Sequence, residues 1–460
     1  MSSNWPSSCS ADLEVPSDAP KRGFRQGRSR RLLGVVGLCM LLISGLQLSA
    51  QENSPFSRFG IGDILEDDFI ASRGMGGIST GLFDRNTLNI ANPASYAYLQ
   101  RTTFDFGIYG NVLRLDDGSE TNSSGNGNLT HLAFGFPVIR NKMGLSVGLV
   151  PFSRTQYNIQ DFEVSADTLL GRLDYEFRGE GALYDIYIGA GYRWNGFSVG
   201  VNASYLFGTI DRSRFLSFPD VDGSYSTRAI TANSVGGLVF DLGAGYRVDF
   251  PNDLDLNIGV TGRLQTNVGG RENVEWTTVQ LIDNGALFFK DSVTVTELRD
   301  NGITLPAEFS AGFTLRQGYR SIDDPLWRIG VDFSMGQWSN FEGFDSEQPF
   351  VNSWKIQAGF EVTPVDNAET NGRPVDLRAG FQYGKSNLSF DGQDLSEFGI
   401  TIGLGVPISL GTAQQRNSKL NFAFTAGQRG NSSVFTETFY RGTIGFTFSD
   451  SFWFLKSKVN

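Results

Sequence analysis

Three short patterns in this sequence resemble enzyme motifs. Gly144–Gly148 and Gly196–Gly200 both read Gly-x-Ser-x-Gly, which in α/β hydrolases places a nucleophilic serine on a sharp strand-to-helix turn. The stretch GFQYGKS, from Gly380 to Ser386, is one residue short of a phosphate-binding loop. The single histidine, His131, precedes both serines, which is the wrong order for that hydrolase fold. A barrel lipase with a Ser–His pair is the enzymatic alternative, but the patterns favour a protein without enzyme activity.

Side chains that bind metals or nucleic acids are equally scarce. One histidine and two cysteines cannot build a zinc or iron–sulfur site, so we predict no metal site and no cofactor. The balance of 49 acidic against 38 basic residues argues against nucleic acid as a partner. Asp116, Asp117 and Glu120 lie in a predicted loop, where they either bind divalent cations together with lipopolysaccharide or are simply solvated. The second reading is the simpler one.

In most of the sequence, apolar residues alternate with polar or small ones at every second position. From Phe197 to Phe207, apolar residues at odd positions alternate with Ser198, Gly200, Asn202 and Ser204. Successive side chains on a β-strand point to opposite faces, so each such segment predicts a strand with one apolar face. The pattern predicts fourteen strands, at 102–114, 129–138, 143–157, 183–193, 196–210, 232–248, 254–267, 303–316, 326–338, 352–363, 375–385, 398–411, 417–429 and 438–449.

The connections between these strands alternate in length. Those after the second, fourth, sixth and twelfth strands are short, whereas long polar stretches follow the first, third, fifth and seventh, including 158–182 and 268–302. The turns at 317–325 and 364–374 are longer than this alternation predicts. Short turns on one side and long loops on the other are typical of outer-membrane barrels. Only a closed sheet can cross lipid, because hydrocarbon offers no partner to a free edge. We therefore predict an all-β chain, a 14-stranded antiparallel transmembrane β-barrel of a Gram-negative outer membrane; a soluble β-protein is the alternative.

The first hundred residues differ from the rest. Residues 21–31 are basic and 32–46 are apolar, the order of a secretory signal peptide, and the apolar run is too short to span a membrane. We place the signal peptide at 1–50, which includes both cysteines. Residues 51–101 show no sustained alternation but carry apolar bursts, so we predict that they fold into the lumen as an N-terminal plug. The barrel then spans 102–460.

Several short motifs resemble the FadL-type family of outer-membrane transporters of hydrophobic compounds, which includes TodX and PorV-like barrels. They are Gly74-Met75-Gly76-Gly77, Asn92-Pro93, Leu305-Pro306, Asp332 and Trp338 to Phe341. The chain's ending resembles that of barrels of this kind from bacteria that also carry PorV. The resemblance implies a 14-stranded barrel with an N-terminal plug. It also implies passive diffusion of hydrophobic molecules through the lumen, with lateral exit at a kinked third strand.

Pro151 lies in the predicted third strand. Proline cannot donate a hydrogen bond to the ladder, so either the strand bulges there or it ends at Val150. Charged and polar residues at alternate strand positions are the candidates for lining the lumen: His131, Asp255, Arg263, Arg328, Asp332, Asp376 and Arg378.

Two functions are consistent with this sequence. The first, which we favour at this stage, is passage of fatty-acid-like or hydrocarbon-like molecules. The alternative is a structural or adaptor subunit of an outer-membrane secretion or assembly complex, as PorV is. The expected partners are outer-membrane lipid and lipopolysaccharide, a hydrophobic ligand and, in the second reading, other envelope proteins. A continuous apolar pocket would favour transport, and a filled lumen would favour the adaptor.

Overall fold

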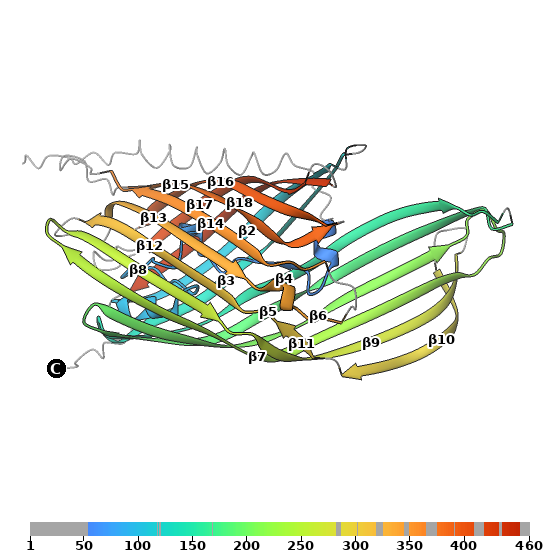
Figure 1. Ribbon diagram of the computed structural model, residues 1–460, viewed down its shortest axis with the longest axis horizontal. Helices are drawn as coiled ribbons and strands as arrows, with labels where there is room; N and C mark the ends of the chain where they lie inside the picture. The colour runs from blue at the N-terminus through green and yellow to red at the C-terminus, as the bar shows by residue number, and fades with distance from the viewer. Residues whose placement is uncertain are drawn as a thin grey trace, which may run out of the picture. The chain divides into compact units, whose positions relative to one another are not determined.

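The computed structural model describes most of residues 54–450 (Figure 1). The predicted signal peptide at 1–50 lies outside the described residues. Within 54–450 the stretches that are not described are 117, 119–120, 168, 282–286, 301, 319–324, 345–348, 365–374, 391, 409–417 and 432–434.

The N-terminal segment, defined as residues 54–101, contains only short elements: η1 (Pro55–Arg58), β1 (Asp63–Ile64), α2 (Ile70–Arg73) and η2 (Pro93–Tyr98). The remaining elements are almost all strands: β2 (Thr102–Asp116), β3 (Thr121–Ile139), β4 (Met143–Val164), β5 (Arg172–Trp194), β6 (Phe197–Ser217), β7 (Ser226–Phe250), β8 (Leu254–Arg263), β9 (Thr266–Leu281), β10 (Leu287–Asp300), β11 (Ile303–Leu305), β12 (Glu308–Gly318), β13 (Pro325–Gly336), η3 (Trp338–Asn340), β14 (Ser353–Val362), β15 (Asp376–Phe390), β16 (Gln393–Ile408), β17 (Ser418–Asn431) and β18 (Phe435–Asp450). None of the helices in the described ranges is long and apolar enough to cross a membrane.

The strands form one closed antiparallel ring. Each pairs with its neighbours in chain order, and β18 closes the ring on β2, with Asp450 opposite Thr102. Two of the fourteen strands of the ring are divided into shorter elements. β8 continues as β9, and β10 and β11 pair with β9 before β12 pairs with β8. The prediction of a fourteen-stranded closed barrel is therefore confirmed.

The period of two separates the inner face of the barrel from its outer face. On β6 the side chains of Val199, Val201 and Tyr205 are exposed, whereas Ser198 and Asn202 between them are buried. The same order holds over much of the ring, so the exposed face is an apolar band, while the inner face is mainly polar apart from a buried apolar cluster that includes Leu183, Leu206 and Val239. This is the reverse of a soluble sheet protein, and it fits a barrel surrounded by lipid.

The predicted long loops at 158–182 and 268–302 are wrong in large part. β4 continues to Val164 and β5 begins at Arg172, while β9 and β10 take up most of the second stretch. Likewise, β3 already begins at Thr121, within the predicted first loop. Apart from Phe162 and Val164, which are exposed, the extensions of β4 and β5 carry mainly polar residues on their outer face, so they lack the apolar alternation that marked the other strands.

β4 runs through Pro151 without ending. Its register against β5 shifts between Pro151 and Ser153, which marks a bulge, and its pairing with β3 stops at Leu149. Of the two alternatives at Pro151, the structure shows the bulge. Beyond it, β3 and β4 are no longer paired.

Candidate functional site in the barrel interior

The N-terminal segment packs against the inner face of the barrel wall. α2 and η2 contact strands on opposite parts of the ring, α2 lying against β16 and β17 and η2 against β5, β6 and β7. Met75, Ile78, Tyr96 and Leu99 are almost completely buried. The segment therefore contacts strands from both the first and the second half of the ring.

Gly74, Met75, Gly76 and Gly77 turn the chain after α2. Gly76 and Gly77 have φ angles of 75° and 84°, in the left-handed region that favours glycine. Gly380 of β15 faces this turn, and a Cβ atom built on it would lie 2.1 Å from the backbone nitrogen of Gly76. The turn and the wall thus meet backbone to backbone, and the Gly76 N–H donates to Thr401 Oγ1 at 2.8 Å.

Asn92 and Pro93 begin η2. The Asn92 Oδ1 atom accepts a hydrogen bond from the Ala94 N–H at 3.1 Å, and its Nδ2 donates to the Thr80 carbonyl at 2.7 Å. Asp332 on β13 lies at the other end of this connection. Its Oδ2 accepts hydrogen bonds from the backbone N–H groups of Ser79 and Thr80, at 2.6 and 2.7 Å.

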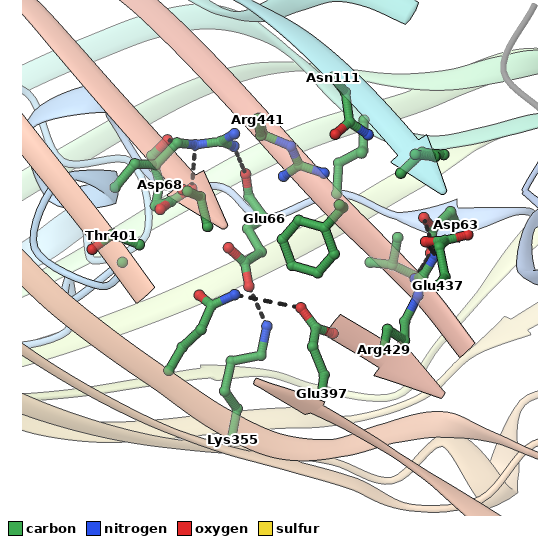
Figure 2. Close-up of a pocket in the computed structure, with 18 residues that line it drawn as sticks. Asp63, Glu66, Asp68, Asn111, Lys355, Glu397, Thr401, Arg429, Glu437 and Arg441 are labelled. Carbon is green, nitrogen blue, oxygen red and sulfur yellow. Dashed lines mark hydrogen bonds and ion pairs between the residues drawn. The ribbon is translucent and has the colours of Figure 1, made fainter. Parts of the chain in front are cut away.

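A polar cavity of about 90 Å³ lies between the segment and β14 to β18 (Figure 2). Glu66 pairs with Lys355, and the Arg73 Nε lies 2.8 Å from the Asp68 Oδ1. On the far side Arg429 contacts both Asp63, at 2.6 Å, and Glu437, at 2.9 Å. The cavity is also lined by Asn111, Glu397, Thr401 and Arg441. Acidic residues of the segment therefore face basic residues of the wall.

The carboxyl groups of the segment respond to this cavity in different ways. Burial alone would raise the pKa of Glu66, but the adjacent Lys355 ammonium overrides it and lowers the pKa to about 2. Burial raises the pKa of Asp68 to about 6, against the attraction of Arg73. Glu66 is therefore the fixed anion of this part of the segment.

A second cavity, of about 140 Å³, is mainly acidic. Asp67, Asp185, Asp241 and Glu308 line it together with one arginine, Arg263. The Arg263 Nε donates to Asp241 Oδ1 at 2.7 Å, and its other nitrogens lie 3.8 Å from Asp67 and 3.7 Å from Glu308. Burial, together with the nearby carboxylates, raises the pKa of Asp67 to about 7 despite Arg263.

A third group of charges lies between the segment and strands β13, β14 and β15. Arg378 donates to Glu361 at 2.6 Å and to Asp376 at 2.8 Å, while Arg328 donates to Asp84 of the segment at 2.9 Å. The cavity among them measures only about 30 Å³. Burial opposes ionisation of Asp84, yet Arg328 outweighs it and lowers the pKa of that carboxyl.

The two remaining lumen candidates are also paired inside the barrel. His131 Nε2 lies 2.6 Å from Asp105 Oδ1, and the imidazole packs edge-on against Phe69 of the segment. Asp255 accepts hydrogen bonds from Arg316 at 2.7 Å and from Arg247 at 2.5 Å. Neither serine of the Gly-x-Ser-x-Gly patterns lies on a strand-to-helix turn, because Ser146 is within β4 and Ser198 within β6.

The apolar residues at the start of the segment are used in packing. Phe56 is buried against Leu388 and Leu395, and Ile61 lies in a cluster with Leu183, Leu206 and the aromatic residues after β13. These side chains present no open apolar surface. The three cavities described above are polar, so they do not form a continuous apolar pocket.

The break between β3 and β4 is covered by the same segment. β1 pairs with β4 through Asp63–Arg154 and Ile64–Ser153. The Leu65 N–H donates to the Phe152 carbonyl at 3.0 Å, and Ser153 Oγ donates to the Ile61 carbonyl at 2.7 Å. In this structure, the N-terminal segment takes the place of β3 along that edge of β4.

Comparison with known proteins agrees with this geometry. A model of the family described as BamG matches residues 33–460, nearly the whole chain. The chain belongs to the BamG family. Among curated protein sequences, none matches it.

Solved structures show which fold this BamG-family chain shares. The Ralstonia pickettii toluene transporter TbuX is similar with a TM-score of 0.55 and 13% identity, over 84% of this chain and 99% of that one. The Pseudomonas putida toluene transporter TodX gives a TM-score of 0.53 and 14% identity, again over 84% and 99%. The resemblance to FadL-type barrels is thus confirmed for the fold of this BamG-family barrel.

Sequence reasoning missed several charged residues of the BamG-family interior. Lys355 and Glu361 occupy the inner face of β14, next to the exposed Ile356 and Phe360 respectively, so the period of two already marked them. Glu66 and Asp68 carried no such signal, since the segment that holds them has no period. Their role follows only from the wall residues that the fold brings to them.

Proposed function

We propose that this BamG-family barrel is a structural subunit of an outer-membrane protein assembly or secretion complex, and that it presents an extended sheet to partner proteins outside the membrane. The N-terminal segment acts as a plug that keeps the lumen closed. The observation that carries the proposal is the length of one part of the wall. β4, β5, β6 and β7 have 22, 23, 21 and 25 residues, whereas β13 and β14 have 12 and 10.

The extra length lies beyond the apolar band. In the row Ile186, Tyr205 and Leu238 the outer side chains are apolar and exposed. Two rows further, Ala182, Thr209 and Ser234 replace them, and the exposed charges of Glu180 and Asp211 follow. At ~3.3 Å per residue, about ten additional residues add roughly 30 Å of strand past the lipid.

The direction of the strands indicates the side on which this extension stands. β2 begins and β18 ends at one rim of the barrel, and β4 reaches Val164 at the other (Figure 1). In outer-membrane barrels with an even number of strands, both termini lie in the periplasm. We therefore place the extension, made of the distal parts of β4 to β7 with β9 and β10, at the cell surface of a Gram-negative bacterium.

The interior supports a structural role over a conduit. The three cavities described above measure about 90, 140 and 30 Å³, and each is lined by an ion pair between the wall and the N-terminal segment. A hydrophobic molecule would have to displace buried ion pairs, at a cost of several kcal/mol for each charge left without its partner. A partner protein that binds the extension has no such cost.

The test is native mass spectrometry of the protein extracted from outer membranes in mild detergent. We expect a stoichiometric complex with other envelope proteins. A lone barrel that retains a small, non-stoichiometric lipid-like mass would contradict the proposal.

Passage of small hydrophobic molecules is the second candidate. The break between β3 and β4 favours it, because it leaves an opening in the wall once residues 61–65 move away, and the fold is shared with two toluene transporters. The double substitution Ile64→Cys with Ser153→Cys, at directly opposed positions of β1 and β4, would introduce a disulfide that closes that exit. If uptake of a radiolabelled hydrocarbon stops in the oxidised variant and returns on reduction, lateral transport is the function; an unchanged rate contradicts it. The two single substitutions are the controls.

A further inference from the structure

The inference concerns the free edge of β4 and rests on the proposed function above. β4 pairs with β5 along its entire length, from Met143–Tyr192 to Val164–Arg172. On its other side it pairs with β3 as far as Leu149 and then with β1 at Ser153 and Arg154. Beyond these positions, the described part of the chain places no strand beside the last residues of β4.

The covered part of this edge shows how it accepts a chain. The Phe152 carbonyl accepts the Leu65 N–H at 3.0 Å, and the Gln156 carbonyl accepts the Ser54 N–H at 3.3 Å. Strand alternation turns the backbone groups of Gln160, Phe162 and Val164 to the same side. The Phe162 N–H has no strand partner there and donates instead to the Asp161 carboxylate at 2.8 Å.

A groove of about 370 Å³ begins at the last residues of β4 and crosses onto the paired strands β5 and β6. Phe162 on β4 and Phe215 on β6 lie on the same face of the sheet and give the groove its aromatic side chains. Asp161, Asp174 and Glu176 outnumber its single arginine, Arg172, whose guanidinium lies 4.5 Å from the Phe162 ring centroid. A long exposed strand edge is normally shielded by proline, lysine or a covering element, and residues 159–164 read Ile-Gln-Asp-Phe-Glu-Val.

We propose that the β4 edge from Gln160 to Val164 binds an extended strand of another envelope protein, which carries basic side chains alternating with an apolar one. Added strands gain affinity from main-chain hydrogen bonds and specificity from pockets for alternate side chains. Here the edge supplies the hydrogen bonds, the Phe162 ring packs against the apolar side chain, and the surplus of carboxylates selects its basic neighbours. The chain's own residues 54–65 already bind the adjacent part of the edge in this way.

The test uses full-length protein in its own outer membrane, with a photo-reactive phenylalanine derivative at position 162. We expect a cross-link to one extended segment of a different envelope protein, identified by mass spectrometry. The substitution Gln160→Pro removes a donor that β5 does not need and should reduce the cross-link at least tenfold. Gln160→Ala keeps the donor and should leave the yield unchanged.

A second variant, Asp174→Lys with Glu176→Lys, reverses the charge of the groove without changing the backbone. It should reduce cross-linking as well, and heat-dependent gel mobility checks that each variant folds. If the partner complex persists in Gln160→Pro and position 162 gives no cross-link, the edge proposal is wrong while the proposed function stands. If no stoichiometric partner is found with any variant, the proposed function is wrong too. A cross-link between two copies of this chain would also overturn the proposed heterologous partner.

Discussion

Arg429 of β17 holds both carboxylate oxygens of Asp63, at 2.6 and 3.2 Å, although the two residues are 366 positions apart. Asp63 belongs to β1, whose backbone pairs with β4 on another part of the ring. Arg429 also contacts Glu437 on β18 at 2.9 Å. One guanidinium therefore connects the N-terminal segment to the two last strands of the barrel.

The first prediction concerns this contact. Arg429→Gln should destabilise the barrel by about 3–5 kcal/mol, because it leaves the carboxylates of Asp63 and Glu437 without their cation. The measurement is urea unfolding in detergent micelles. Arg178→Gln removes an arginine whose side chain is half exposed and should change stability by less than about 0.5 kcal/mol. Equal losses in both variants would show that the contact has no special role.

The second prediction concerns the close approach of segment and wall. Gly380→Val should displace the turn at Met75 and Gly76 and cost about 1–3 kcal/mol, because its side chain would need space that the backbone of Gly76 occupies. Gly442→Val is the matched control on β18, since a Cβ atom there meets nothing within 4 Å. Limited proteolysis reports the release of the segment. A protected segment in Gly380→Val would contradict the proposed seating.

The third prediction concerns the pairing of Lys355 with Glu66. Lys355→Met leaves Glu66 buried beside an apolar group, so its pKa should rise well above about 2. A double-mutant cycle with Glu66→Gln should give a coupling of at least about 1 kcal/mol. Additive effects of the two substitutions would show that the pair contributes nothing beyond its separate members.

The fourth prediction is a dependence on pH. The pKa values of Asp67 and Asp68 are raised in the folded protein to about 7 and about 6, so these carboxyls bind protons more tightly when folded than when unfolded. Their contribution to stability is therefore fully present below about pH 4 and is lost as the pH rises to about 7.

We accordingly expect the N-terminal segment to be digested faster at about pH 8 than at about pH 5. The contribution of Glu66 to stability depends on pH in the opposite sense. Because its folded pKa is about 2, that contribution is lost only at more acidic pH. Asp67→Asn should reduce the difference between the two conditions, whereas Glu163→Gln at the exposed tip of β4 should preserve it. An Asp67→Asn protein with an unchanged pH profile would contradict the assignment.

The sequence predicts the barrel well where one face of each strand contacts lipid and must therefore be apolar. Ile329 and Phe333 face lipid and Arg328 and Asp332 face the interior, so the alternation of side chains is visible without a structure. The strand extensions have water on both sides, and this removes the alternation. For that reason the sequence predicts a loop at 158–164 and 172–182, whereas the structure has strands there.

The interior network is less predictable for a different reason. Alternation assigns Arg263, Asp376 and Arg378 to the inner face but does not specify their partners, which depend on register across several strands. The N-terminal segment has no period at all. Its position depends on backbone contacts with wall glycines such as Gly380, and composition alone does not show which glycine meets which residue.

The seam between β2 and β18 determines the order in which this molecule can be completed. The N-terminal segment precedes β2 directly, and the ring around it closes only when the last strand reaches the first. The N-terminal segment is therefore synthesised before the strands that surround it. Before the ring closes, the segment can bind the inner face of the incomplete sheet without passing through either rim of the barrel. The final hairpin of β17 and β18 carries Arg429. When β18 pairs with β2 and closes the ring, the same step brings Arg429 to Asp63 of the N-terminal segment.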